Sequence, residues 1–144
     1  MDAQLQVLGE LIAAAENAEI RFWFYGGYGL DALLGRTLRP HKDIDLLLRH
    51  EDLARLVESL LSAGFTVQEG KGHSVGLLKS GQWIECLTFE RLADGTLVTD
   101  TGDTGMFPWP DGAFPDEPNG VLARKQVRAI SWEAQYVLKA GHQA

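Results

Sequence analysis

The chain has few of the cysteines and none of the clustered histidines that stabilise small secreted or metal-binding proteins. Its 144 residues include a single cysteine, Cys86. One cysteine cannot form an internal disulfide, and this is typical of proteins that fold in a reducing compartment. The four histidines do not cluster at the spacing of zinc ligands. We therefore expect no disulfide framework, no transition-metal site and a cytoplasmic location.

Long apolar runs are also missing. No run reaches the roughly 18 residues that a membrane-spanning helix needs. Where an export signal would carry Lys or Arg, the N-terminal segment carries acidic residues, namely Asp2, Glu10, Glu16 and Glu19. The sequence therefore predicts neither export nor a membrane partner.

Basic residues are outnumbered, with 13 Lys and Arg against 20 Asp and Glu and a formal net charge of −7. This sign is wrong for coating a nucleic-acid backbone. A phosphate ligand would need a metal ion or a few focused cations, and the field of the protein favours a cationic partner. We expect small-molecule ligands and no nucleic acid.

The 144 residues, 45% of them hydrophobic, suffice for one core and one domain over 1–144. Apolar spacing predicts helices over 4–18, 28–34 and 51–63, and Ser131 can cap a last helix over 132–140 that Gly141 ends. Short apolar runs predict strands over 22–25, 43–48, 65–69, 74–79 and 82–89, with edge strands within 121–130. The expected fold class is α/β (α+β), a single mixed β-sheet flanked by helices.

The segment 90–120 is rich in Gly, Asp and Pro and contains Phe107, Trp109 and Phe114. A loop this long within a compact domain is uncommon and is often functional. It could be an aromatic and acidic lid over a cationic, sugar-like acceptor, aided by cation–π contact. The alternative is a proline-stiffened surface loop that packs its aromatic side chains onto the core.

Two acidic residues, Asp43 and Asp45, open the second predicted strand. Alternate strand residues project from one face, about 6.6–7 Å apart along the strand, so their carboxylates can converge. At about 4 Å, two such charges repel by about 4 kcal/mol at an effective dielectric of 20, which favours a cation between them. Mg²⁺ suits such a pair, because it takes one or two carboxylates plus substrate phosphates.

Gly26 and Gly27 could form the phosphate-binding half of the same site. Glycines allow backbone N–H groups to approach a phosphate closely, and these two lead into a helix whose N-terminus attracts anions. Arg39 and His41 lie shortly before the acidic pair and could add positive charge for a triphosphate.

Glu85 is a third candidate acid. It lies between apolar residues in the middle of the predicted strand 82–89, where a charge is costly unless it is paired or coordinated. If this strand lies beside the Asp43 strand, Glu85 could share a metal ion or deprotonate an acceptor hydroxyl.

The stretch GGYGLDALLGRTLRPHKDIDLLL (26–48) resembles the signature of the small antibiotic nucleotidyltransferases. These include the aminoglycoside 2″-adenylyltransferases and the lincosamide nucleotidyltransferases of the polymerase-β-like superfamily. Their pattern is a strand, Gly-Gly-Trp, an Asp three residues beyond the aromatic, and Arg-x-His-x-Asp-Ile-Asp. Tyr28 replaces the usual Trp, and residues 130–135 resemble the family's Ser-x-Glu-Ala stretch. The resemblance covers nearly the whole chain, strongly over 22–48 and thinly over 90–125.

The resemblance implies a nucleotidyltransferase fold and an enzyme that uses Mg²⁺ and ATP or another NTP. It would transfer a nucleoside monophosphate to a small-molecule hydroxyl, such as one on an aminoglycoside or lincosamide antibiotic, and release pyrophosphate. Lys139 and His142 are the last candidates for closing the site, and a homodimer is left open. The implied catalytic and metal-binding residues are Asp43, Asp45 and Glu85, and the implied nucleotide-binding residues are Gly26, Gly27, Tyr28, Arg39 and His41.

Two other functions compete with this one. Residues 27–32 fit G-x-G-x-x-A after a strand, the fingerprint of a Rossmann dinucleotide-binding protein. That fold requires a full helix followed by a strand with its acid at the far end, whereas here the acids open the strand. The second alternative is a non-catalytic, antitoxin-like binding partner with a nucleotidyltransferase-like fold. Three aligned acids argue for catalysis, because a scaffold does not need them.

Overall fold

The computed structural model describes residues 2–35, 40–69, 73–102 and 105–143. The described residues form four α-helices and a short 3-10 turn, η1 (His50–Asp52). The helices are α1 (Asp2–Asn17), α2 (Gly26–Leu34), α3 (Leu53–Ser62) and α4 (Trp132–Gln143). The prediction that Gly141 ends the last helix is wrong, because α4 continues to Gln143. A glycine ends a helix only where it takes the left-handed conformation.

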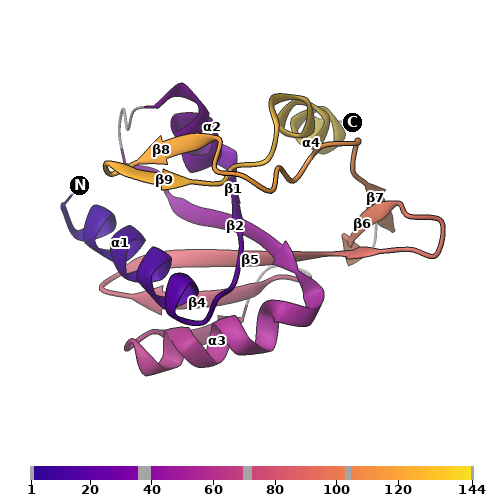
Figure 1. The fold of residues 1–144 in the computed structure, drawn as a ribbon. Coiled ribbons are helices and arrows are strands. Elements are labelled where there is room, and N and C mark those ends of the chain that lie inside the picture. The colour runs from indigo at the N-terminus through magenta and orange to yellow at the C-terminus, as the bar shows by residue number, and fades with distance from the viewer. Residues whose placement is uncertain (1, 36–39, 70–72, 103–104, 144) are drawn as a thin grey trace.

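The main sheet has seven strands and is mixed (Figure 1). They are β1 (Trp23–Tyr25), β2 (Asp43–Arg49), β3 (Thr66–Glu69), β4 (Val75–Lys79), β5 (Gln82–Arg91), β6 (Leu97–Asp100) and β7 (Met106–Pro108). The order is β1-β2-β5-β4-β3, with β6 paired to β5 and β7 to β6. A separate hairpin joins β8 (Gly120–Leu122) and β9 (Lys125–Val127). The predicted α+β class is confirmed.

The pairing of β1 with β2 excludes the dinucleotide-binding alternative. These two strands flank α2 and run antiparallel, whereas β2 and β5 are parallel. A Rossmann unit needs its first two strands parallel, because the helix between them crosses back over the sheet. The Rossmann interpretation of residues 27–32 is therefore wrong.

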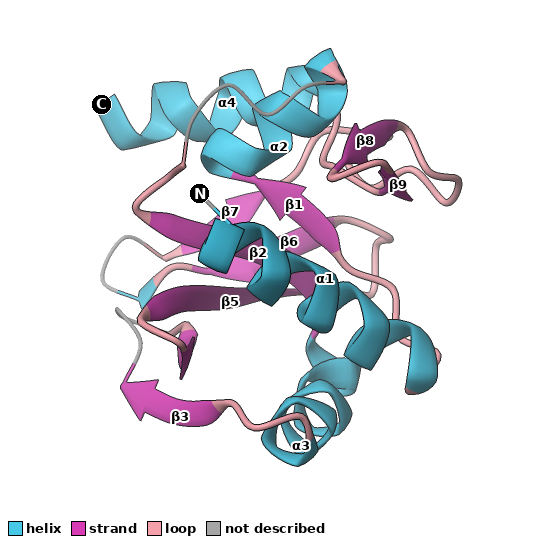
Figure 2. Ribbon diagram, turned by 90° about the vertical axis from the view of Figure 1, so that its left-hand side faces the viewer, coloured by secondary structure: helices cyan, strands magenta, loops and turns pink. Residues whose placement is uncertain are grey.

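Side-chain alternation gives the sheet one apolar face and one mixed face. Ile44, Leu46 and Leu48 project into the larger core, which they share with apolar residues of α1 and α3. Figure 2 shows α1 across the front of the strands, with α3 below and α2 and α4 above. Leu47 faces the opposite side, in a second core with Trp23 and Phe89. Asp43 and Asp45 share the parity of Leu47, so they lie on this second face.

The segment 90–120 is more regular than the sequence indicated. The prediction of a long loop is wrong over its first half, because β5 continues to Arg91 and pairs with β6, which pairs with β7. Trp109 is buried, and its Nε1 donates a hydrogen bond to Thr99 Oγ1 at 2.8 Å. The ring of Phe114 stacks on Phe89 at 3.8 Å between centroids. The aromatic side chains of this segment therefore pack onto the core, as the second alternative proposed.

Among the described residues, no helix combines the length and the apolar character that crossing a bilayer demands.

Candidate active site

The parallel pairing of β2 with β5 brings the three predicted acids to one place. Asp45 lies directly opposite Glu85 in the register, and Asp43 lies opposite Trp83. All three carboxylate residues line one cavity of about 290 Å³ on the second face of the sheet. Residues of β6 and β7 and Trp109 contribute its far wall. The expectation that the Glu85 strand lies beside the Asp43 strand is confirmed.

The three acids do not form a ready-made metal cage. Within the described ranges, no group of three or more His, Cys, Asp or Glu side chains could hold a metal ion by itself. Glu85 is 8% exposed, and its Oε2 accepts a hydrogen bond from Trp83 Nε1 at 3.0 Å. The donor set still fits Mg²⁺, because this ion commonly takes one or two carboxylates and completes its shell with phosphate oxygens and water.

The glycine turn lies directly against the carboxylates. Gly26 has φ +67° at the first position of α2, and a Cβ there would lie 2.7 Å from Asp45 Oδ2. The preceding residue, Tyr25, is extended and provides no side-chain cap for the helix. The first N–H groups of an uncapped helix are available to an anion. The predicted phosphate cradle and the predicted acids are therefore neighbours.

His41 lies behind this turn, outside the cavity. Its ring occupies the space that a Cβ on Gly27 would fill. Its Nε2 lies 2.7 Å from Asp31 Oδ2, and Asp31 is 4% exposed. His41 therefore packs against α2, and Asp31 fixes the position of its ring.

Tyr28 is also a structural residue here. Its ring is buried, meets His41 edge-on at 4.5 Å, and its hydroxyl donates a hydrogen bond to Gln4 Oε1. The side chain of Gln4 in turn bonds the backbone N–H and C=O of His41. The side chains of Tyr28 and His41 line neither cavity of the site, unlike Gly26 and Gly27. Arg39 lies outside the described residues.

A second cavity, of about 640 Å³, lies between α2 and α4. Gly26, Gly27 and Leu30 line it from α2, and Lys139 brings a cation to it from α4. The other lining residues are Tyr25, Asp45, Trp132, Gln135, Tyr136 and Leu138. Tyr25, Asp45 and Leu138 line both cavities, so the two spaces meet at the carboxylate edge.

Tyr25 is a site residue that the sequence analysis missed. Burial, with the charges of Asp45 and Glu85 beside it, raises the pKa of the Tyr25 phenol. It therefore stays protonated as a neutral O–H group between the two cavities. Tyr25 lies opposite Asp45 in the pairing of β1 with β2, so its side chain is on the same face of the sheet. Alternation along each strand could have indicated this, but the sequence alone did not show that the two strands are neighbours.

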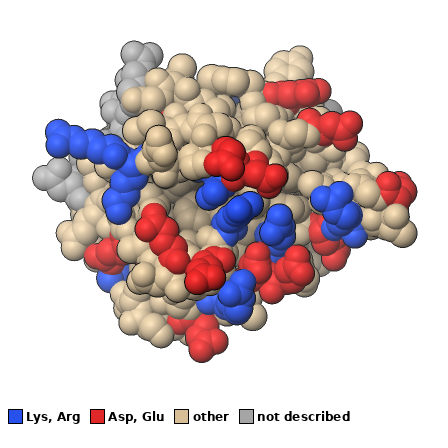
Figure 3. Space-filling model, in the orientation of Figure 1, with Lys and Arg blue, Asp and Glu red and all other residues tan. Residues whose placement is uncertain are grey.

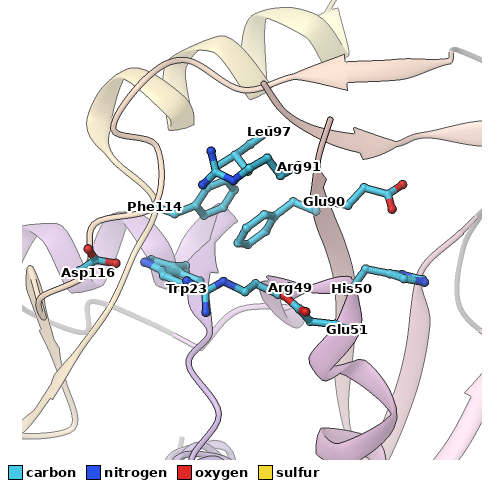
Figure 4. Close-up of a pocket in the computed structure, with 10 residues that line it drawn as sticks. Trp23, Arg49, His50, Glu51, Glu90, Arg91, Leu97, Phe114 and Asp116 are labelled. Atoms are coloured by element: carbon cyan, nitrogen blue, oxygen red, sulfur yellow. The ribbon is translucent and has the colours of Figure 1, made fainter. Parts of the chain in front are cut away.

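A third hollow, of about 560 Å³, lies at the opposite ends of β2 and β5. Figure 4 shows Arg49 and Arg91 on either side of the Trp23 and Phe114 rings. Phe89 lines the same hollow. Of the predicted catalytic and nucleotide-binding residues that the structure describes, none lines it.

Known proteins resemble this chain along almost its whole length. The sequence model of the family described as Aminoglycoside-2''-adenylyltransferase matches residues 7–144. A 2''-aminoglycoside nucleotidyltransferase of Escherichia coli is 29% identical over 134 residues, covering 91% of this chain and 70% of the relative. A lincosamide resistance protein of Staphylococcus haemolyticus is 23% identical, covering 88% of this chain and 78% of the relative.

Solved structures show the same likeness in the fold. ANT(2")-Ia in complex with adenylyl-2"-tobramycin superposes with a TM-score of 0.78 and 26% identity, covering 97% of this chain and 78% of that one. The lincomycin-bound lincosamide adenylyltransferase LnuA superposes with a TM-score of 0.75 at 20% identity, covering 94% and 85%. With the family's sequence model matched from residue 7 to residue 144, the chain is a nucleotidyltransferase of the aminoglycoside-2''-adenylyltransferase family.

Proposed function

We propose that the protein transfers a nucleoside monophosphate from Mg²⁺-bound ATP, or another NTP, to a hydroxyl of a small-molecule antibiotic. One observation carries this proposal: two cavities meet at Asp45 and Tyr25. One has the glycine turn and a lysine, which suit a triphosphate. The other has carboxylates, which suit a hydroxyl acceptor that must lose a proton.

The cavity between α2 and α4 is the nucleotide side. Backbone N–H groups at Gly26 and Gly27, at the uncapped start of α2, would bind phosphate oxygens. Lys139 lines the same space and adds a charge-assisted donor. Arg39 stays a proposed phosphate contact on the strength of its place in the family signature.

Asp43 and Asp45 would hold Mg²⁺, since both are on the same face of β2 and line the carboxylate cavity. The ion would neutralise charge that develops on the transferred phosphoryl group.

Glu85 would act as the general base for the acceptor hydroxyl. Its alternative role is to share the metal ion. In the first role its carboxylate takes the proton of the acceptor hydroxyl. The hydroxyl oxygen then forms a bond to the α-phosphorus while the bond from that phosphorus to the pyrophosphate oxygen breaks. The Trp83 indole donates a hydrogen bond to Glu85 Oε2 and so fixes the position of the side chain.

The acceptor would be cationic. Asp100 adds a further acid to the carboxylate cavity, and Phe107 and Trp109 supply aromatic surface. The net charge of −7 also favours a cation. On the face shown in Figure 3, the acidic and basic side chains of the described residues are interspersed. The relatives' names point to aminoglycosides and lincosamides.

Antibiotic-dependent release of pyrophosphate from ATP tests the proposal. Asp45→Asn keeps the size of the side chain but removes the charge, and we expect at least an approximately 100-fold fall in turnover. Asp94→Asn is the matched control, because Asp94 is exposed and lies in the turn between β5 and β6. Equal turnover by wild type and Asp45→Asn, across a panel of aminoglycosides and lincosamides, would remove the catalytic assignment.

A further inference from the structure

One buried polar atom near the glycine turn lacks a partner. Gln135 is 8% exposed, and its Nε2 makes no hydrogen bond to the described residues. A buried donor without a partner lowers the stability of the folded protein, so such groups are rare. A ligand that brings an acceptor atom would remove this penalty.

The position of Gln135 is specific. A Cβ on Gly29 would clash with its Nε2, so the side chain fits against α2 in this position because residue 29 is a glycine. Gln135 lines the cavity between α2 and α4, together with Gly26 and Lys139. The residue that carries the unpartnered amide therefore lies in the wall of the space that we assign to the nucleotide, and its Nε2, now packed against Gly29, reaches a ligand there when the side chain turns away from α2.

The order of residues along α4 separates the two ends of that space. Leu138 lines both cavities, whereas Trp132, Gln135 and Tyr136 line only the one between α2 and α4. Six residues of helix, about 9 Å, separate Leu138 from Trp132. A nucleotide with its phosphates at Gly26 and Gly27 would thus extend its sugar and base along α4, away from the carboxylates.

Exposed aromatic side chains line the end of the cavity that lies away from the carboxylates. Trp132 is 53% exposed and Tyr136 is 74% exposed, and both line the cavity. Leu30 of α2 contributes another exposed apolar side chain. Aromatic side chains commonly stack on nucleobases whatever the base.

We infer that Gln135 is a specificity-determining residue: its side-chain amide donates a hydrogen bond to the sugar–base part of the NTP, which the aromatic residues Trp132 and Tyr136 cover. This inference rests on the proposed function, because it places the nucleoside of the same NTP. It adds a role for α4 that the metal-binding and phosphate-binding residues do not supply.

The test is the Gln135→Leu variant, with ATP and inorganic tripolyphosphate as two probes. Leucine fills the same buried space without a donor, so the ligand-free variant should melt at the wild-type temperature or above it. ATP should bind about 10-fold more weakly to the variant, whereas tripolyphosphate should bind equally to both proteins. Titration calorimetry in the presence of Mg²⁺ measures both affinities. Gln6→Leu, at an exposed position of α1, is the control and should leave both unchanged.

Quenching of Trp132 fluorescence gives a second readout. Trp23 and Trp109 are buried, whereas Trp83 is half-buried beside Glu85. ATP should therefore change the emission of the exposed Trp132, and the part of the change that Trp132 contributes should disappear in Trp132→Phe. An ATP effect that survives in Trp132→Phe at full size would contradict the placement of the base.

The outcomes separate the two proposals. If the wild type binds neither ATP nor another NTP, the proposed function fails. If the wild type binds ATP and Gln135→Leu binds it equally well, only the role of Gln135 fails. Equal weakening of ATP and tripolyphosphate would assign Gln135 to the phosphates and overturn the inference, and so would a large drop in melting temperature with unchanged ATP affinity. Should Gln135→Leu not fold, Gln135→Met replaces it under the same criteria.

Discussion

At the scale of single residues, Gly26 joins the two halves of the site. Its left-handed φ lets β1 pass directly into α2, and its missing side chain lets Asp45 Oδ2 approach the turn. Any other L-residue there would be strained by about 1–2 kcal/mol from the backbone alone. The glycine is therefore needed both for the conformation and for the closeness of the carboxylate.

Replacing Gly26 with alanine tests this double requirement. We expect Gly26→Ala to lose about 1–2 kcal/mol of unfolding free energy and to lower turnover, because the added Cβ would displace the Asp45 carboxylate. Urea unfolding and the pyrophosphate assay measure the two effects.

Gly9→Ala is the matched control, since Gly9 lies within α1 with no heavy atom within 4 Å of an added Cβ. It should gain about 0.5–1 kcal/mol and keep its turnover. A Gly26→Ala variant as stable and as active as the wild type would show that neither the φ angle nor the approach of Asp45 matters.

At the scale of secondary-structure elements, the placement of α4 depends on the strand-like segment before it. Phe24 of β1 exchanges backbone hydrogen bonds with Arg128 and Ile130, at 2.9 and 3.0 Å. Ser131 Oγ then accepts a hydrogen bond from the Ala134 N–H at 3.1 Å, which caps the helix as the sequence predicted. These contacts fix the start of the helix that lines the α2–α4 cavity.

The side chain of Asn119 completes this attachment. It accepts a hydrogen bond from the Ala129 N–H at 2.8 Å and donates one to the Ala129 C=O at 2.9 Å. Ala129 is fully buried, so Asn119→Ala would leave both backbone groups unpaired. We expect a loss of about 1–3 kcal/mol in unfolding free energy, measured by urea titration. Gln126→Ala, at an exposed position of β9, should change it little, and equal losses in the two variants would refute the bracing role of Asn119.

At the scale of the whole molecule, the sheet separates packing from chemistry. Its apolar face builds the larger core with α1 and α3, and its other face carries the carboxylates beside a second, aromatic core. Burial and these carboxylates raise the pKa values of two groups beside them, a thiol and a phenol. Burial, and then the charge of Glu85, raises the pKa of the fully buried Cys86 thiol. Burial and the neighbouring carboxylates do the same for the Tyr25 phenol.

These shifts predict a loss of global stability in alkali. An unfolded chain loses its thiol proton near pH 8.5 and its phenol proton near pH 10, whereas the folded protein retains both. The unfolded state then binds fewer protons, so the unfolding free energy falls as the pH rises, by up to about 1.4 kcal/mol per pH unit for each group. Urea unfolding from pH 7 to pH 11 measures this. Cys86→Ala should flatten the slope between pH 8.5 and 10, and Tyr25→Phe the slope above pH 10. An unchanged slope in both variants would exclude these two groups as its cause.

The sequence by itself determined the elements and the kind of chemistry. Apolar periodicity placed three of the four helices of the described residues, and the capping serine Ser131 indicated the fourth. The D-x-D spacing placed two carboxylates on one face of a strand, because side chains alternate along a strand. The glycine turn at 26–27 was also predictable from local sequence, because glycine is the residue that adopts a positive φ without strain. The resemblance to the family signature indicated the same glycines and carboxylates independently.

Only the tertiary structure decided how these parts meet. The parallel register of β2 and β5 puts Glu85 opposite Asp45, and strands 40 residues apart in sequence carry no local signal of that pairing. The antiparallel register of β1 and β2 puts Tyr25 opposite Asp45. Contacts with Gln4 of α1 hold Tyr28 and His41 behind the turn, and the packing of α4 leaves Gln135 Nε2 without a partner among the described residues. Alternation is a property of one strand, whereas a site assembled from several strands and a helix depends on which neighbours pack together.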